Sequence, residues 1–274
     1  MKYRRLGTTG LRVSVIGVGT WQLGGEWGRR FTPHEVAELL DRARELGVNL
    51  VDTAECYGDH LAEELIGPAI RHNRADWVVA TKFGHQFHPQ AMGQADRSPV
   101  QLRTDHWIPT EVVAQLEASL RALRTDHVDL YQMHSASDEV FRRHDLWEAL
   151  NQQVANGKVR HLGISLGSSD IDQARRAAEV GASVLQVGYN RLDQSAEQGV
   201  LPVALDQDLG VIAREPLANG YLSGTYRPGA WVTAADDWRS GHDPTEAQHK
   251  LELVEELRRT EVPGGMTMAQ WALG

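Results

Sequence analysis

The stretch VNLVDTAECYG, residues 48–58, is an apolar run that reaches Asp52 and carries Tyr57 five residues later. The pattern recurs downstream, where the run WVVAT leads into Lys82 and the run VDLYQM leads into His134. Short apolar runs that alternate with helical segments are typical of parallel strands covered on both faces. Polar residues that follow such strands meet at one edge of the sheet. These four side chains therefore predict a proton-transfer site, and so an enzyme.

Seven segments of the chain have the pattern expected of buried parallel strands. They are residues 15–19, 48–52, 77–82, 128–133, 159–165, 183–189 and 211–214. Helices are expected at 32–46, 60–72, from Thr110 onward, and at 145–155, 170–180, 191–208, 245–259 and 266–273. The clearest helix start is Thr32, because Pro33 and Glu35 complete the pattern of a capping box.

Two features at the N-terminal end of the chain narrow the fold class. Gly7-Thr8-Thr9-Gly10 separates two short extended runs within residues 2–14, which predicts a β-hairpin. A Rossmann sheet needs a glycine fingerprint after its first strand, and GVGTWQ at residues 17–22 lacks the third glycine. The sequence therefore favours an α/β protein of the closed (β/α)8 TIM-barrel class. A long loop is expected over residues 84–108.

The strand count departs from the ideal barrel. A TIM barrel has eight strands, whereas this chain shows the pattern of only seven. We expect one TIM-barrel domain over residues 1–274, with the eighth strand missing and the C-terminal end incomplete.

Composition excludes several function classes. The formal net charge is -9 over 274 residues, which disfavours nucleic acid and anionic membranes as partners. The only cysteine is Cys56, so an intramolecular disulfide is impossible. The chain contains no run of 18 apolar residues, the length that would predict a membrane-spanning helix. We expect a cytoplasmic, monomeric protein whose partner is a small molecule.

The four strand-end residues suggest a specific chemistry. Tyrosine has an ordinary pKa of about 10 and can act as an acid near neutral pH. The Lys82 ammonium is expected to lower the pKa of Tyr57, while Asp52 keeps that ammonium charged. His134 is placed to donate a hydrogen bond to a substrate oxygen. An acid without a serine nucleophile suits carbonyl reduction, for which a nicotinamide or flavin must supply the hydride.

Later strand ends predict where a cofactor would lie. Ser165, Gln186 and Asn190 are placed to hold a carboxamide group. The segment 214–224, which begins at Arg214, offers backbone N–H groups and one cation for a pyrophosphate.

The chain resembles the aldo-keto reductases along nearly all its length. The matching segments are DTAECYG (52–58), TKFG (81–84), DLYQMH (129–134), GKVRHLGIS (157–165), QVGYN (186–190) and PLANG (216–220). The resemblance implies a TIM barrel that binds NADP(H), with NAD(H) also possible, and that reduces an aldehyde or ketone. It implies Tyr57 as the general acid/base, Lys82 and Asp52 as its tuning pair, and His134 as the residue that orients the carbonyl.

The resemblance also assigns binding residues. The implied cofactor-binding set is Gly19, Thr20, Trp21, Asp52, Ser165, Gln186, Arg214, Pro216, Leu217, Gly220 and Leu222. Trp21, Tyr57 and His134 form the implied substrate-binding set. The chain departs from the family pattern at Leu166, where many members have asparagine, and at Arg214, where many have tyrosine. The family's 2′-phosphate site is not present, so a preference for NADP(H) rests on the resemblance alone.

Two alternatives remain open from the sequence. A barrel with this site could hold a nucleotide and sense redox state, regulating a partner with little turnover. A metal-dependent hydrolase would need clustered histidines and carboxylates at the strand ends, where only Asp52 and His134 qualify. We assign no metal ligand.

Overall fold

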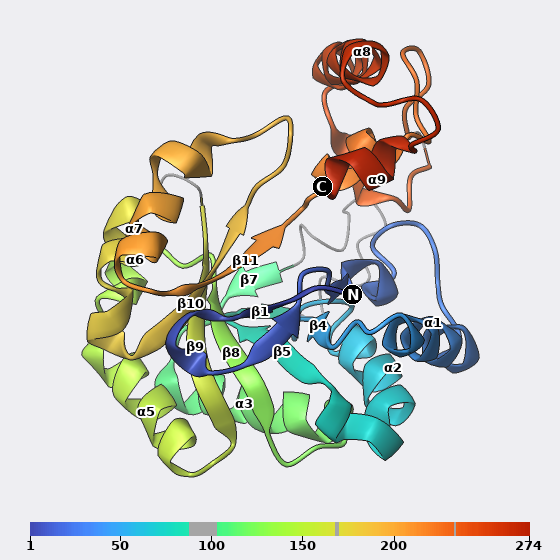
Figure 1. The fold of residues 1–274 in the computed structure, drawn as a ribbon. Helices are drawn as coiled ribbons and strands as arrows, with labels where there is room; N and C mark the ends of the chain where they lie inside the picture. The colour runs from blue at the N-terminus through green and yellow to red at the C-terminus, as the bar shows by residue number, and fades with distance from the viewer. Residues whose placement is uncertain (88–102, 168–169, 233) are drawn as a thin grey trace.

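A parallel sheet of seven strands forms the centre of the computed structural model, which describes residues 1–87, 103–167, 170–232 and 234–274 (Figure 1). In spatial order the strands are β3 (Val18–Gly19), β4 (Leu50–Asp52), β5 (Val78–Phe83), β8 (Val128–His134), β9 (Val159–Leu166), β10 (Ala182–Gly188) and β11 (Gly210–Arg214). Every neighbouring pair is parallel. The predicted barrel class is thus confirmed as a near-closed barrel, and β3 and β11 are the two edges of the sheet within the described ranges.

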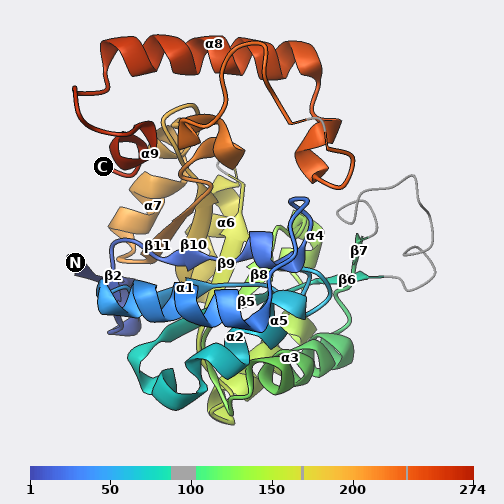
Figure 2. The same cartoon turned by 90° about the vertical axis from the view of Figure 1, so that its right-hand side faces the viewer.

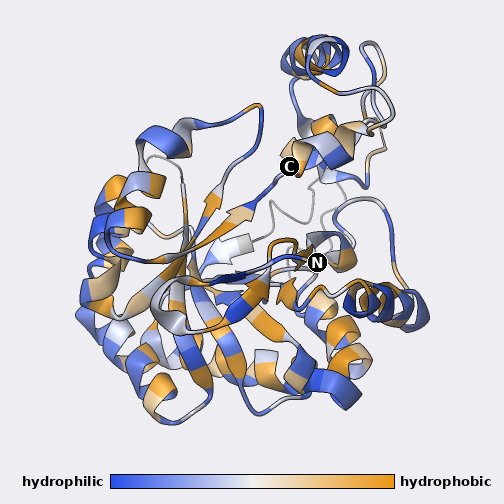
Figure 3. Cartoon of the chain, in the orientation of Figure 1, coloured by the Kyte–Doolittle hydropathy of each residue, from blue (hydrophilic) through white to orange (hydrophobic). Residues whose placement is uncertain are grey.

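Helices follow the strands and cover the outside of the sheet (Figures 1 and 3). They are α1 (Pro33–Glu45), α2 (Leu61–Ile70), α3 (Pro109–Leu123), α4 (Asp138–Phe141), α5 (His144–Ala155), α6 (Ile171–Arg175) and α7 (Val200–Asp206). The capping box at the start of α1 is confirmed, since Thr32 and Glu35 bond each other's backbone N–H. The predicted start at Thr110 is wrong, because α3 begins at Pro109 and has no side-chain cap.

Two predicted helices are broken by short turns. The helix expected over 170–180 is α6 followed by the 3-10 turn Ala177–Val180, and the one over 191–208 is a 3-10 turn, Ser195–Gln198, followed by α7. The predicted loop over 84–108 contains the antiparallel strands β6 (His85–Phe87) and β7 (Arg103–Asp105), and residues 88–102 between them lie outside the described part.

The predicted N-terminal hairpin is confirmed and closes one end of the barrel. Its strands β1 (Tyr3–Arg5) and β2 (Arg12–Ser14) are antiparallel. The connecting 3-10 turn packs against β10 and β11 so closely that a Cβ on Gly7 would lie 2.0 Å from the backbone nitrogen of Gly210. Glycine is therefore required there, the more so because its φ is 54°. A small apolar cluster joins the hairpin to the barrel interior; it comprises Leu6, Val13, Leu50, Val78, Ala80, Leu130 and Val184.

The C-terminal segment forms a second, smaller cluster at one side of the barrel. Helices α8 (Pro244–Thr260) and α9 (Met268–Ala272) pack against the turn Ala218–Ser223 and stand apart from the helices on the sheet (Figure 2). Within the ranges that the structure describes, no helix is both long and apolar enough to cross a lipid bilayer.

Candidate active site

The four predicted catalytic residues meet at the C-terminal ends of adjacent strands. Asp52 ends β4, Lys82 lies near the end of β5, and His134 ends β8. Tyr57 lies in the loop between β4 and α2. Tyr57, Asp52 and His134 line a cavity of about 1670 Å³. Its lining runs from Gly19 and Thr20 at the end of β3 to Val211, Ile212 and Ala213 on β11, the two strands at the edges of the sheet in the described ranges.

The Lys82 ammonium donates hydrogen bonds to three oxygen acceptors. Its Nζ donates to Asp52 Oδ2 at 2.9 Å, to the carbonyl oxygen of Thr53 at 2.7 Å and to the Tyr57 hydroxyl at 3.2 Å. Lys82 is 1% exposed. An ammonium has three protons to donate, so this geometry fixes its direction toward the phenol. The pKa of Lys82 is raised: burial opposes the charge, but the fields of Asp52 and Tyr57 outweigh it.

The pKa of Tyr57 differs from the expectation based on sequence. Burial raises it to about 12, and the Lys82 ammonium opposes that rise without cancelling it. The expected net lowering is therefore wrong in sign for this structure, because removal from water disfavours the phenolate more than one cation favours it. A phenol in this state stays protonated at neutral pH and suits the role of proton donor.

Two close backbone contacts hold the Tyr57 loop in place. A Cβ on Gly24 would lie 2.6 Å from the Tyr57 carbonyl carbon, and one on Gly58 would lie 2.4 Å from the Gly24 oxygen. The loop thereby packs against the segment that carries Trp21, whose ring stacks on that of Tyr57 with centroids 6.2 Å apart. His134 approaches Tyr57 with its ring nearly perpendicular, at a centroid distance of 6.3 Å.

Most predicted cofactor-binding residues border the same cavity. Those that line it are Gly19, Thr20, Trp21, Asp52, Gln186, Arg214, Pro216, Leu217 and Gly220. Arg214 forms an ion pair with its neighbour Glu215. Ser165 and Leu222 are not among the residues that line the cavity. Both are fully buried, Leu222 in the cluster beneath α8, so their predicted parts in cofactor binding stay predictions.

Ser165 and Gln186 occupy paired positions on β9 and β10. The Gln186 amide donates to Asp52 Oδ1 at 2.8 Å, so it holds the Asp52 carboxylate as well as bordering the cavity. The Ser165 hydroxyl is buried and has no hydrogen-bond partner within the described chain. An orphaned buried hydroxyl is unusual and is compatible with a polar ligand group as its partner.

Sequence reasoning missed two residues of the site. Gln132 on β8 donates to Asp52 Oδ1 at 3.2 Å. Its only signal was a polar side chain inside a strand, a position that Asp129 shares on the same strand. Glu55 is 2% exposed, and its Oε1 accepts from the backbone N–H of His85 at 2.9 Å. Glu55 follows three residues after Asp52 and resembles any loop carboxylate in the sequence.

Glu55 predicts a measurable dependence of stability on pH. Burial raises its pKa from 4.5 to about 7. The folded state therefore holds this proton more tightly than the unfolded state, and stability present below pH 4.5 is lost as the pH rises through 7. At 1.36 kcal/mol per pKa unit the loss is about 3 kcal/mol. Glu55→Gln should remove this loss of stability with rising pH. In denaturant titrations at several pH values, the free energy of unfolding of the variant relative to wild type should therefore increase between pH 5 and 8. The same change at exposed Glu38 should leave the pH profile unaltered; equal profiles for wild type and Glu55→Gln would contradict the prediction.

The fold and the site together define a class: a barrel oxidoreductase with a tyrosine–lysine–aspartate–histidine group at its mouth. The chain belongs to the aldo/keto reductase family, because the sequence model of that family matches residues 15–274.

Relatives and solved structures agree with this assignment. The uncharacterized oxidoreductase YrpG of Bacillus subtilis (strain 168) is 35% identical over 237 residues, which cover 82% of this chain and 69% of that protein. The NADH-specific methylglyoxal reductase of Escherichia coli (strain K12) is 30% identical over 239 residues, covering 84% and 72%. The structure of the glycerol dehydrogenase of Gluconobacter oxydans aligns with a TM-score of 0.80 at 25% identity, covering 98% of this chain and 80% of that one.

Proposed function

We propose that this protein reduces an aldehyde or ketone to an alcohol, with hydride from a bound NADPH or NADH and a proton from Tyr57. The observation that carries the proposal is the 3.2 Å contact between the Lys82 ammonium and the Tyr57 hydroxyl at the wall of a large cavity. A buried phenol beside a cation is a poor base but a competent acid, because the cation stabilises the phenolate left after proton transfer.

Each residue of the group has a separate task in this proposal. Tyr57 donates its proton to the carbonyl oxygen as negative charge develops there. Lys82 stabilises the resulting phenolate, and Asp52 keeps the ammonium charged and aligned. His134 donates a hydrogen bond to the same oxygen and thereby orients the carbonyl. The nicotinamide, when bound, supplies the hydride.

The residues at the cavity support a nicotinamide cofactor. Gln186 lines the cavity, and the buried, orphaned Ser165 hydroxyl is paired with it in the strand register, so a carboxamide that reaches Gln186 would lie near a second polar partner. The segment Pro216, Leu217 and Gly220 offers backbone to a pyrophosphate along the cavity wall. NADP(H) follows from the family resemblance, while the NADH-specific relative from Escherichia coli keeps NAD(H) as the alternative.

Ser165→Ala should weaken nucleotide binding without lowering the stability of the unliganded protein. Loss of one hydrogen bond is worth about 0.5–1.5 kcal/mol, so Kd should rise roughly two- to tenfold. Quenching of tryptophan fluorescence during NADPH and NADH titrations measures this change. Ser119→Ala is the matched control. The Ser119 hydroxyl is also buried without a partner among the described residues, but it lies on α3, whereas Ser165 is paired in the sheet with Gln186 of the cavity wall. An unchanged Kd in Ser165→Ala would remove Ser165 from the binding site.

A single-turnover experiment tests the proposed activity directly. Protein in excess over NADPH, or over NADH, is mixed with a reactive aromatic aldehyde, and the loss of nicotinamide absorbance is followed. We expect complete oxidation of the bound nucleotide. Tight nucleotide binding with no oxidation for any aldehyde or ketone would contradict the proposal and favour a nucleotide-holding, redox-sensing barrel.

A further inference from the structure

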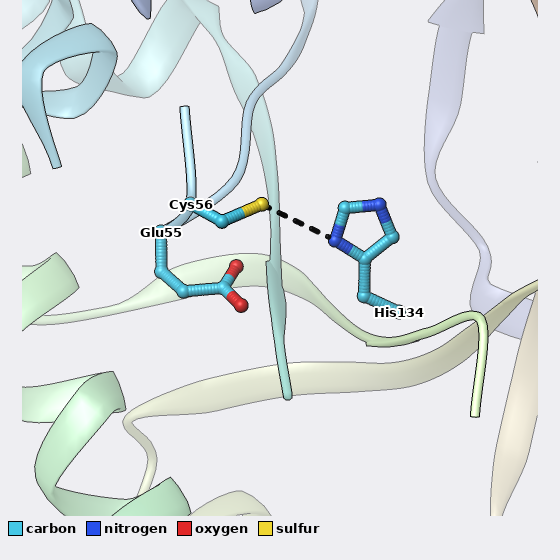
Figure 4. A group of neighbouring side chains, drawn as sticks. All are labelled: Glu55, Cys56 and His134. Carbon is cyan, nitrogen blue, oxygen red and sulfur yellow. Dashed lines mark hydrogen bonds between the residues drawn. The ribbon is translucent and has the colours of Figure 1, made fainter. Parts of the chain in front are cut away.

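Three side chains of types that bind metals lie together beside Tyr57. None of them donates the proton in the proposed reaction, although His134 orients the carbonyl. Glu55 and Cys56 come from the loop after β4, and His134 faces them from the end of β8 (Figure 4). A carboxylate oxygen, the thiol sulfur and an imidazole nitrogen all lie within 4.8 Å of one another. We propose that Glu55, Cys56 and His134 form a binding site for Zn²⁺ and that occupation of this site inhibits the enzyme.

The separation of sulfur and nitrogen already matches tetrahedral zinc. Cys56 Sγ lies 3.6 Å from His134 Nδ1. Zinc binds thiolate at about 2.3 Å and imidazole at about 2.0–2.1 Å, and a tetrahedral angle between those bonds separates sulfur from nitrogen by about 3.6 Å. Two of the three ligands therefore need almost no rearrangement to share one ion.

Glu55 supplies a second, independent indication of a ligand. Its side chain is buried, and Oε2 has no hydrogen-bond partner in the described part of the chain, although Oε1 accepts from the His85 backbone. Buried carboxylate oxygens without partners are costly. Figure 4 shows the side chains of Glu55 and Cys56 extending from their loop toward the side on which the His134 ring lies.

The ligand set selects the metal. One thiolate, one imidazole and one carboxylate suit Zn²⁺, whereas Mg²⁺ and Ca²⁺ prefer oxygen ligands alone. Three protein ligands leave a fourth position for water, as in zinc sites that are open to solvent. Binding displaces the thiol proton of Cys56, and the carboxyl proton of Glu55 where it is present; these protons pass to solvent, so no oxidant or reductant is needed.

Inhibition follows from the geometry that the ion would impose. Tetrahedral ligands lie about 3.3–3.6 Å apart, so a set spread over as much as 4.8 Å must contract by roughly 1 Å. Because Cys56 and His134 are already spaced for zinc, Glu55 makes most of this approach, and the His134 imidazole takes its position from the ion instead of from the carbonyl oxygen. Misplacing a catalytic group by about 1 Å can cost on the order of a hundredfold in rate. This half of the proposal rests on the proposed role of His134 in reduction; metal binding itself does not.

Cobalt(II) is the spectroscopic probe for the site. The full chain is treated with a chelator, freed of it and titrated with Co²⁺. We expect visible bands typical of tetrahedral cobalt and a sulfur-to-metal charge-transfer band, which Zn²⁺ displaces. Cys56 is the only cysteine, so it must be the source of the charge-transfer band. Cys56→Ala should abolish that band, and Glu55→Gln should lower the apparent affinity at least about tenfold.

His34→Ala is the control variant, because His34 forms an exposed pair with Glu38 on α1 and should not affect the cobalt spectrum. In activity assays, Zn²⁺ should lower wild-type kcat on the order of a hundredfold, with each variant compared with its own metal-free rate. Cys56→Ala should resist zinc. Absence of a cobalt–thiolate band in wild type would overturn the site, and zinc inhibition that persists in Cys56→Ala would overturn its inhibitory role. If metal-free protein reduces no carbonyl compound, the proposed function fails while the cobalt spectrum still decides the metal site.

Discussion

Tyr57→Phe is expected to lower kcat for carbonyl reduction by roughly 10²–10⁴-fold, the usual contribution of a positioned general acid. The substitution removes a proton donor that contacts the Lys82 ammonium and lines the cavity. It keeps the aromatic ring that stacks on Trp21, so the shape of the site is retained. Nucleotide affinity should change less than about threefold, because the hydroxyl contacts Lys82 in the unliganded protein.

The matched control for this substitution is Tyr131→Phe. Tyr131 is a buried tyrosine on β8 whose hydroxyl donates to the Val112 carbonyl oxygen at 3.3 Å, and it does not line the cavity. Its loss should cost about 1 kcal/mol of stability and leave kcat near wild type. Steady-state kinetics with saturating cofactor, together with fluorescence titration, measure both effects. A Tyr57→Phe enzyme with normal kcat would eliminate the phenol as the proton donor.

Lys82→Met is expected to affect both turnover and folding. The ammonium makes three hydrogen bonds in a site where it is 1% exposed, and its removal leaves Asp52 without its cation. Breaking a buried ion pair costs about 3–5 kcal/mol. Turnover should fall by at least about 10²-fold, because the phenolate formed after proton transfer loses its stabilising charge.

Lys158→Met provides the comparison, since Lys158 is 38% exposed and pairs with Glu117 on the protein surface. That change should cost no more than about 1 kcal/mol and leave kcat unaltered. Urea denaturation measures the loss of stability in Lys82→Met, and stopped-flow hydride transfer measures the loss of turnover. The kinetic measurement is made under conditions in which the variant is folded. A Lys82→Met enzyme that is as stable and as active as Lys158→Met would refute the role of the ammonium.

The sequence was sufficient to predict the order of the barrel and the residues at its strand ends. Apolar runs of strand length alternate with helical segments, and this local pattern places Asp52, Lys82 and His134 at the same end of parallel strands. The register of β4, β5 and β8 confirms that arrangement. Strand boundaries agreed to within a few residues for the same reason, because periodicity is a property of neighbouring positions in the chain.

Element breaks were harder to predict. The helices expected over 170–180 and 191–208 are each divided by a 3-10 turn. Apolar spacing continues across such a turn, so the sequence pattern resembles one longer helix. The strands β6 and β7 pair with each other across the segment between them, and local periodicity does not indicate which distant run a short strand pairs with.

Burial and contacts between distant segments decided the chemistry of the site. Sequence reasoning identified the Tyr57–Lys82 pair but gave the wrong sign for the tyrosine pKa, because the energy of removing a phenolate from water depends on the packed surroundings. Gln132 could not be assigned to Asp52 until β8 was seen two strands away from β4. The 3.6 Å approach of Cys56 to His134 joins residues 78 positions apart.

The chain's residue pattern thus determined which strands form and which polar groups stand at their ends, since both depend on neighbours within one turn or one strand. Only the tertiary structure decided how deeply each group lies, which donor reaches which acceptor, and that Glu55, Cys56 and His134 share one space. Those properties depend on desolvation and on distances across the barrel, which no local stretch of sequence contains.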